Sequence, residues 1–445
     1  MLAFRLEGWT NGSGFHGLTV NVSGMRPNIS GLMYIGLLAA VSGISMLRIL
    51  VAAEGLPKAD FAEYAAVVAL GSFLGGILSF GKVEATIKSF PKLAAVGQIA
   101  MIRDDARTLM LLLAKRSLAI SLPLIAFGHV FSTKPALTLG AGFFYAFGVG
   151  CFAILASVQR ALSQPRLLLA GTAFRALCAF SITSVMVNFT DVSLWVLLAA
   201  ECLVMIAASL ISEVVIFTRS VISSAADSTS DRLPAMVSIS SDSGLIIFFA
   251  FTLIAAPVYL DRFIVNMIFN TDDAARYAIF GVFLLVPSLL VNTICQRVGP
   301  DIVKMVSSST NRGPVIRYMA TWSLVPILIW GIFLFIVYLS FNYSIVPDGL
   351  LKYKISSNDL IPIFLLGIGA VSSILEFYMM ALDRERDWLA LVITYIFTVF
   401  LIVLIVDSCF LKLNTFIWLM ASARIFYLLL MFKSSILSKG TPPMA

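Results

Sequence analysis

Residues 388–406 of this chain read WLALVITYIFTVFLIVLIV, an apolar run without a single charged side chain. A helix of about 20 such residues, rising 1.5 Å per residue, crosses the ~30 Å hydrocarbon core of a bilayer. Runs of this kind recur along most of the 445 residues, of which 60% are hydrophobic and 12% are charged. A soluble core could not bury that much apolar surface. The sequence therefore predicts an integral membrane protein and excludes a soluble enzyme.

The apolar runs predict an all-α protein with about twelve transmembrane helices. Each run is uniformly apolar over about 20 residues, whereas the strands of a membrane β-barrel alternate over about 10. The predicted spans are 32–53, 62–80, 108–128, 136–159, 165–187, 193–217, 243–268, 275–296, 316–340, 360–382, 388–408 and 413–432. The links between them are too short for a folded catalytic domain, so no enzyme activity is expected.

Positive charge is distributed unevenly over the links. If the N-terminus is cytoplasmic, most of the 31 Lys and Arg residues fall in cytoplasmic links or tails. The positive-inside rule then predicts that both termini lie on the cytoplasmic side of the membrane. This bias explains the net charge of +7 without a nucleic-acid partner, for which no motif is present. Five cysteines and two histidines without ligand spacing predict neither disulfides nor a metal site.

An internal repeat predicts two halves. Arg48-Ile-Leu-Val51 precedes Tyr64-Ala65 across a short outer turn, and Arg262-Phe-Ile-Val265 precedes Tyr277-Ala278 in the same way. Six spans in each half with the same orientation are typical of transporters built from parallel repeats. The predicted organisation is a cytoplasmic leader (1–31), a six-helix bundle (32–217), a cytoplasmic linker (218–242), a second six-helix bundle (243–432) and a cytoplasmic tail (433–445).

Arginines at matched positions in the two halves are the first candidates for a binding site. A charge at the centre of a span costs about 2.5–3.5 kcal/mol on insertion scales, so such residues are expected to face a polar interior. Arg48 and Arg262 both lie in the outer third of their spans. Two planar guanidinium groups could bind one anionic ligand from opposite walls. The alternatives are snorkelling to the outer headgroups and structural pairing with Glu54 or Asp261.

Charges near mid-depth form a second group of candidates. Arg175 and Glu201 lie at similar depths in the first half, and Arg424 and Glu376 do so in the second. These depths predict two structural pairs, while the arginines are also candidates for ligand binding. Together with Asp261, the two glutamates are the candidates for pairing or for coupling to an H⁺ or Na⁺ gradient. No cofactor is predicted.

Small residues predict one close helix contact. Gly71-Ser-Phe-Leu-Gly75 has the spacing that lets two helices approach closely in a membrane. The run that follows, Gly76 to Val83, nearly matches a phosphate-binding loop but has valine at its last position and ends an apolar span. It is therefore not taken as a nucleotide site.

Several segments together are typical of one family of membrane proteins. They are Arg48 to Tyr64, Tyr259-Leu-Asp261-Arg262-Phe-Ile-Val265 followed by Ala274-Ala-Arg-Tyr277, Gly299-Pro300-Asp301-Ile-Val-Lys304, Arg160-Ala-Leu-Ser-Gln-Pro165-Arg166, and Ala381-Leu-Asp383-Arg384-Glu-Arg386. On these residues the chain resembles the bacterial polysaccharide flippase family of the multidrug/oligosaccharidyl-lipid/polysaccharide (MOP) exporter superfamily. It departs from the family pattern after Arg48, where Val51-Ala-Ala-Glu54-Gly55 replaces the usual Leu-Gly.

The resemblance implies a V-shaped pair of six-helix bundles that lies in the bacterial inner membrane and works by alternating access. Its implied cargo is an undecaprenyl-pyrophosphate-linked oligosaccharide for surface polysaccharides such as lipopolysaccharide O-antigen or exopolysaccharide. A polysaccharide polymerase and glycosyltransferases would then be partners, and Arg48, Arg262, Arg175 and Arg424 would be the pyrophosphate candidates. The alternative is a cation-coupled exporter of small organic molecules with the same fold. Four arginines inside spans favour the anionic cargo.

Overall fold

The computed structural model describes residues 29–79, 98–162, 165–189, 193–224, 242–308, 312–353, 356–382 and 384–437, together with Lys82, Thr86, Phe90, Leu93 and Ala94. The predicted leader (1–31), linker (218–242) and tail (433–445) lie largely outside this part of the chain. Every element within it is helical.

The helices correspond to the predicted spans in order. They are α1 (Ile29–Gly55), α2 (Lys58–Ile77), α4 (Ile99–Val130), α5 (Lys134–Ala161), α6 (Pro165–Phe189), α7 (Leu194–Ser224), α8 (Asp242–Ile268), α9 (Thr271–Phe283), α10 (Leu285–Ser308), α11 (Gly313–Asn342), α12 (Asp348–Leu351), α13 (Ser357–Ile368), the 3₁₀ helix η2 (Gly369–Val371), α14 (Ser372–Ala381), α15 (Glu385–Ser408) and α16 (Leu413–Leu437). Within the described residues, 11 stretches are long and apolar enough to cross a membrane, and α1 is a further helix of 27 residues. The prediction of a multi-pass α-helical membrane protein is confirmed.

Several helices extend beyond the predicted spans. α4 begins at Ile99 and carries Arg103 and Asp104 in its first turns, and α10 continues through Gly299 and Pro300. Hydropathy marks where the apolar run ends, whereas backbone hydrogen bonding continues into the aqueous layer. Span eight is divided into α9 and α10 near Pro287, which has no N–H to donate to the preceding turn.

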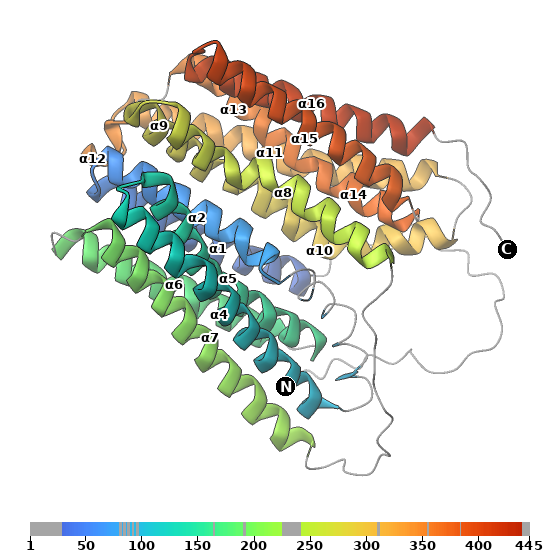
Figure 1. The fold of residues 1–445 in the computed structure, drawn as a ribbon. Helices are drawn as coiled ribbons and strands as arrows, with labels where there is room; N and C mark the ends of the chain where they lie inside the picture. Colours follow the sequence, from blue (N-terminus) through green and yellow to red (C-terminus); the bar gives the residue numbers. More distant parts are fainter. Residues whose placement is uncertain are drawn as a thin grey trace.

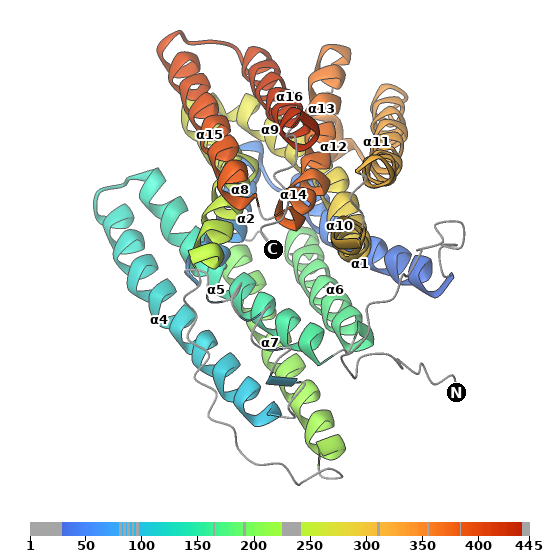
Figure 2. The ribbon, with the colours of Figure 1, turned by 90° about the vertical axis from the view of Figure 1, so that its right-hand side faces the viewer.

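The two halves lie side by side. Helices α1 to α7 form one group and α8 to α16 the other (Figures 1 and 2). At the junction, α2 packs against α8 and α9, and α1 packs against α10. The turns at 55–58 and 269–271 and the segment 342–353 gather at one end, opposite to the start of α1 and the end of α16 (Figure 1). We call this the outer end, following the predicted topology.

Apolar side chains are buried between the helices and also exposed on the outside of the helix bundles. One cluster of buried apolar residues runs through both halves and includes Ala52 and Tyr64 from the first half and Ala275 and Tyr277 from the second. Large apolar side chains such as Phe397 remain exposed, as helices facing lipid require.

The predicted close contact of α2 is confirmed. A Cβ added at Gly71 would lie 2.7 Å from Cδ1 of Tyr145, and one added at Gly75 would lie 3.2 Å from Cγ1 of Val149. Both partners belong to α5. The absence of side chains at these two glycines therefore sets the spacing of α2 and α5.

Candidate functional site

The first half is built around one buried carboxylate, that of Glu201 on α7, which has no exposed surface. Its Oε2 accepts hydrogen bonds from the Arg48 guanidinium at 3.0 Å and the Tyr145 hydroxyl at 3.2 Å. Its Oε1 accepts from the Tyr64 hydroxyl at 2.7 Å and the Thr183 hydroxyl at 2.5 Å. Arg48 also donates to the Tyr145 oxygen at 2.9 Å. We call these five residues the Glu201 network.

The Glu201 network joins five helices, since its members come from α1, α2, α5, α6 and α7. A charge buried in an apolar interior is tolerated only when it is paired and hydrogen-bonded. Arg48 supplies the opposite charge, and three hydroxyl groups occupy the remaining acceptor positions. The network thus neutralises Arg48 inside the first half, where 8% of that residue is exposed.

Arg175 on α6 lies near this network but is not part of it. Its guanidinium carbon sits 3.8 Å from the centre of the Phe152 ring, a cation–π contact. It is close enough to Arg48 to interact with it electrostatically. Among the described residues, no carboxylate forms an ion pair with Arg175. Within that part of the chain, the Arg175 guanidinium therefore has no ion-pair partner and lies near the neutralised Arg48.

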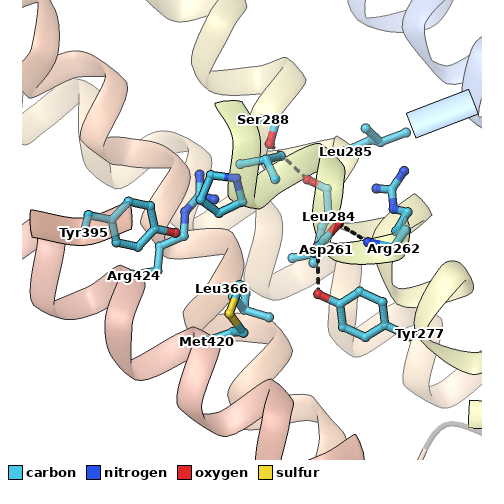
Figure 3. Close-up of a pocket in the computed structure, with 12 residues that line it drawn as sticks. Asp261, Arg262, Tyr277, Leu284, Leu285, Ser288, Leu366, Tyr395, Met420 and Arg424 are labelled. Carbon is cyan, nitrogen blue, oxygen red and sulfur yellow. Dashed lines mark hydrogen bonds between the residues drawn. The ribbon is translucent and has the colours of Figure 1, made fainter. Parts of the chain in front are cut away.

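The second half has its own buried acid, Asp261 on α8 (Figure 3). Its Oδ2 accepts from the Tyr277 hydroxyl at 2.7 Å, and its Oδ1 accepts from the Arg262 backbone N–H at 2.6 Å. The Arg262 guanidinium donates to the carbonyl of Gly281 at 2.5 Å. A Cβ at Gly281 would overlap this guanidinium, so the glycine leaves the space that Arg262 occupies.

A small cavity with both polar and apolar walls lies between Asp261 and Arg424 on α16. The cavity has a volume of about 30 Å³, enough for a water molecule, and Tyr277, Ser288 and Tyr395 also line it. In Figure 3, Arg424 and Tyr395 lie on one side of the cavity, and Asp261 and Tyr277 lie on the other. The Arg262 guanidinium points away from Arg424 (Figure 3).

Glu376 on α14 is the other buried acid of the second half. It accepts a hydrogen bond from the Ser372 hydroxyl at 3.1 Å, and 3% of the residue is exposed. Arg424 lies close enough to interact electrostatically with both Glu376 and Asp261. It forms an ion pair with neither of them. Arg424 therefore lies near two carboxylates without forming an ion pair with either of them.

The acid and the arginine lie on opposite helices in the two halves, so that the first helix carries the arginine in one half and the acid in the other. In the first half the arginine is on the first helix, α1, and the acid is on the last, α7. In the second half Asp261 is on the first helix, α8, and Arg424 is on the last, α16. The first pair is closed at 3.0 Å, whereas the second is separated by the cavity. Each half, as far as it is described, therefore presents one arginine near mid-depth without an ion-pair partner, Arg175 and Arg424.

Sequence reasoning located the charged residues but assigned the partners incorrectly. Glu201 pairs with Arg48 and not with Arg175, because the Arg48 guanidinium on α1 reaches the Glu201 carboxylate while the Arg175 guanidinium lies over the Phe152 ring. Sequence reasoning also missed Tyr145, Thr183 and Tyr395, which complete the two sites. Isolated hydroxyl side chains in otherwise apolar helices are the signal that could have found them. Among the described residues, no cluster of His, Cys, Asp and Glu could hold a metal ion.

Comparisons with known proteins add information about the fold. No family model and no curated protein matches the sequence. Several solved structures match over 91% of this chain. A multidrug resistance MATE family transporter of the MOP superfamily, in an inward-facing conformation, matches with a TM-score of 0.56 at 10% identity over 97% of its length.

Two further solved structures have similar scores. A MOP superfamily transporter from Pyrococcus furiosus matches with a TM-score of 0.53 at 13% identity over 95% of its length, and its description states that reversed polarity of the binding pocket suggests a different function. The MATE multidrug transporter DinF-BH, solved in complex with a rhodamine dye, matches with a TM-score of 0.53 at 11% identity over 92% of its length. The fold of this chain is thus the fold of MATE and MOP transporters.

Proposed function

We propose that this chain is a membrane transporter that moves its cargo between its two halves by alternating access. The observation that carries the proposal is the fold, which follows that of MOP superfamily transporters over 91% of the chain. The moving units would be the halves 32–217 and 243–432. The bacterial inner membrane, with both termini in the cytoplasm, is the location that this function and the positive-inside bias favour.

The comparisons favour a small organic molecule as the cargo. Two of the solved structures are described as multidrug transporters, and one of them is in complex with a rhodamine dye. An exporter of this kind would be driven by a cation gradient. Asp261 beside the small cavity and the buried Glu376 are the carboxylates that would take up the coupling ion.

The arginines favour a second cargo, an anionic lipid-linked molecule. Arg175 and Arg424 carry charges that no described carboxylate neutralises by an ion pair, and they lie in different halves. Their planar guanidinium groups suit the oxygens of a pyrophosphate. Arg48 and Arg262 would act indirectly, since the first is bound to Glu201 and the second to a backbone carbonyl. An undecaprenyl-pyrophosphate-linked oligosaccharide is the specific cargo of this proposal, and a polymerase and glycosyltransferases would be its partners.

One binding experiment separates the two cargoes. The purified protein is titrated in detergent with the rhodamine dye and with undecaprenyl pyrophosphate, alongside the variants Arg175→Met, Arg424→Met and Arg317→Met. If the cargo is anionic, the first two variants should lower the affinity for undecaprenyl pyrophosphate by roughly tenfold or more each, the effect of losing a charge-assisted hydrogen bond.

Arg317 is exposed near the start of α11 and serves as the matched control. Binding of the dye that is unaffected by Arg175→Met and Arg424→Met would support the exporter of small organic molecules. Binding of neither ligand, together with the absence of dye transport in liposomes, would contradict both cargoes.

A further inference from the structure

The last carbonyls of α1 are hydrogen-bonded from the other half of the molecule. The final turn of a helix leaves its C=O groups without donors, and Pro57 has no N–H that could serve Ala53. The Tyr353 hydroxyl donates to the Ala53 carbonyl at 3.1 Å. The Lys352 ammonium donates to the carbonyls of Leu56 at 2.8 Å and Glu54 at 3.2 Å. A positive charge at this position also favours the C-terminal end of the helix dipole.

Packing reinforces these hydrogen bonds. The Tyr353 ring is 2% exposed and lies 5.5 Å, centre to centre, from the ring of Phe61 on α2. The short helix α12 reaches the same place, because a Cβ at Gly349 would lie 2.6 Å from Cγ of Glu54. The residues 348–353, all from the second half, therefore cover the turn between α1 and α2.

An ion pair lies beside this contact. Lys58 at the start of α2 pairs with Asp272 at the start of α9 at 2.7 Å. These two residues, with Lys352 and Tyr353, line a cavity of about 520 Å³ at the outer end. The wide cavity and the partly exposed Lys58 place water next to the bonds that join the halves.

We propose that residues 348–353 form a latch that closes the outer end by capping α1, and that outward opening requires its release. This inference rests on the proposed alternating-access transport, in which the outer end closes. The latch is the contact that holds the outer end closed. Release would expose the carbonyls of Ala53, Glu54 and Leu56 to water, which replaces the lost donors. The closed state is thus held by a few hydrogen bonds beside water, and these can be broken and remade in each cycle.

The charges around Lys352 keep the latch weak enough to open. Burial and the neighbouring Lys58 lower the pKa of Lys352, while Glu54 acts in the opposite direction. Closing the latch brings two ammonium groups into one cavity. The repulsion between them offsets part of what the new hydrogen bonds contribute.

A distance measurement tests the latch without any cargo. Spin labels are attached at Ala59→Cys on α2 and Ser357→Cys on α13, both exposed and in different halves, in a version without native cysteines. Electron paramagnetic resonance then gives the distribution of distances in detergent and in lipid. Tyr353→Phe keeps the ring against Phe61 but removes the donor. It should raise the ratio of open to closed molecules by about fivefold, the effect of one ordinary hydrogen bond.

Lys352→Met should shift the distribution in the same direction, and the double variant further. Lys412→Met, which changes an exposed lysine at another outer turn, should leave the distribution unchanged. Identical distributions in the parent and the double variant would overturn the latch. Should Lys352→Met fold poorly, Tyr353→Phe alone carries the test, since it keeps the ring in its packed position and removes only the donor. Longer distances in the variants, together with no transport in liposomes, would contradict the proposed function but would still support the latch.

Discussion

At the scale of single residues, Glu201 is closely constrained by its hydrogen-bond donors. Its carboxylate receives donors from Arg48, Tyr64, Tyr145 and Thr183, on four different helices. A buried ion pair contributes little net stability compared with apolar packing, but removal of one partner leaves an uncompensated charge. The network therefore specifies how the helices of the first half meet.

This asymmetry predicts a difference between single and double substitutions at the pair. Arg48→Met should destabilise the protein by about 3–5 kcal/mol because Glu201 loses its counter-charge. Arg48→Met combined with Glu201→Gln should recover much of the loss, since the amide needs no counter-charge. Thermal aggregation in detergent and the amount of protein in the membrane report both effects. If the double variant were as unstable as Arg48→Met, the stabilising effect of Arg48 would not come from its pair with Glu201.

At the scale of helices, close approach of α2 and α5 positions the Glu201 network. Gly71 on α2 faces Tyr145 on α5, and the Tyr145 hydroxyl is a member of the network. A side chain at Gly71 would push α5 outward and displace that hydroxyl. Packing between two helices and the geometry of the buried charge are therefore linked.

Two glycines of α2 provide a matched comparison of this link. Gly71→Ala should destabilise the protein by about 1–3 kcal/mol, the usual cost of overpacking, because the added Cβ would lie 2.7 Å from Tyr145. Gly76→Ala adds the same methyl group to the same helix where nothing lies within 4 Å. It should be neutral or stabilising by up to about 1 kcal/mol. Equal melting temperatures of the two variants would contradict the role of Gly71.

At the scale of the whole molecule, the turns of both halves meet at one end. The turn after α15 lies at this outer end and carries Cys409, which is exposed. The other free cysteines within the described residues are buried or partly buried inside helices: Cys151, Cys178, Cys202 and Cys295. Chemical labelling of Cys409 can therefore report the orientation of the native chain in the membrane.

Cys409 should react with a membrane-impermeant thiol reagent added to intact cells. The positive-inside bias predicts that its turn faces outward, and its exposure makes the thiol accessible. Cys409→Ser should abolish the labelling. Lys433→Cys, in that background, should be labelled only after the cells are opened, because the end of α16 lies at the opposite side. Labelling of Lys433→Cys in intact cells would reverse the topology.

The sequence alone determined the membrane environment, the succession of membrane-spanning helices and the close contact at Gly71 and Gly75. These features depend on hydropathy over about 20 residues or on residue size at a fixed spacing, both of which are local properties of the chain. The helix ends were less accurate, as with α4 and α10, because hydrogen bonding does not stop where apolar residues do. The matched arginines of the repeat were also found from spacing alone.

Only the tertiary structure decided which charges meet. Depth along a span gives one coordinate of a residue, whereas pairing also depends on the rotation of each helix and on its neighbours. By depth Arg175 was the candidate for Glu201, whereas the packing of α1 against α6, which itself packs against α7, brought Arg48 to that carboxylate instead. The capping of α1 by Lys352 and Tyr353 depends even less on local sequence patterns, because it joins residues about 300 positions apart. Contacts at that separation are fixed by how the two halves assemble, and no spacing within either half encodes them.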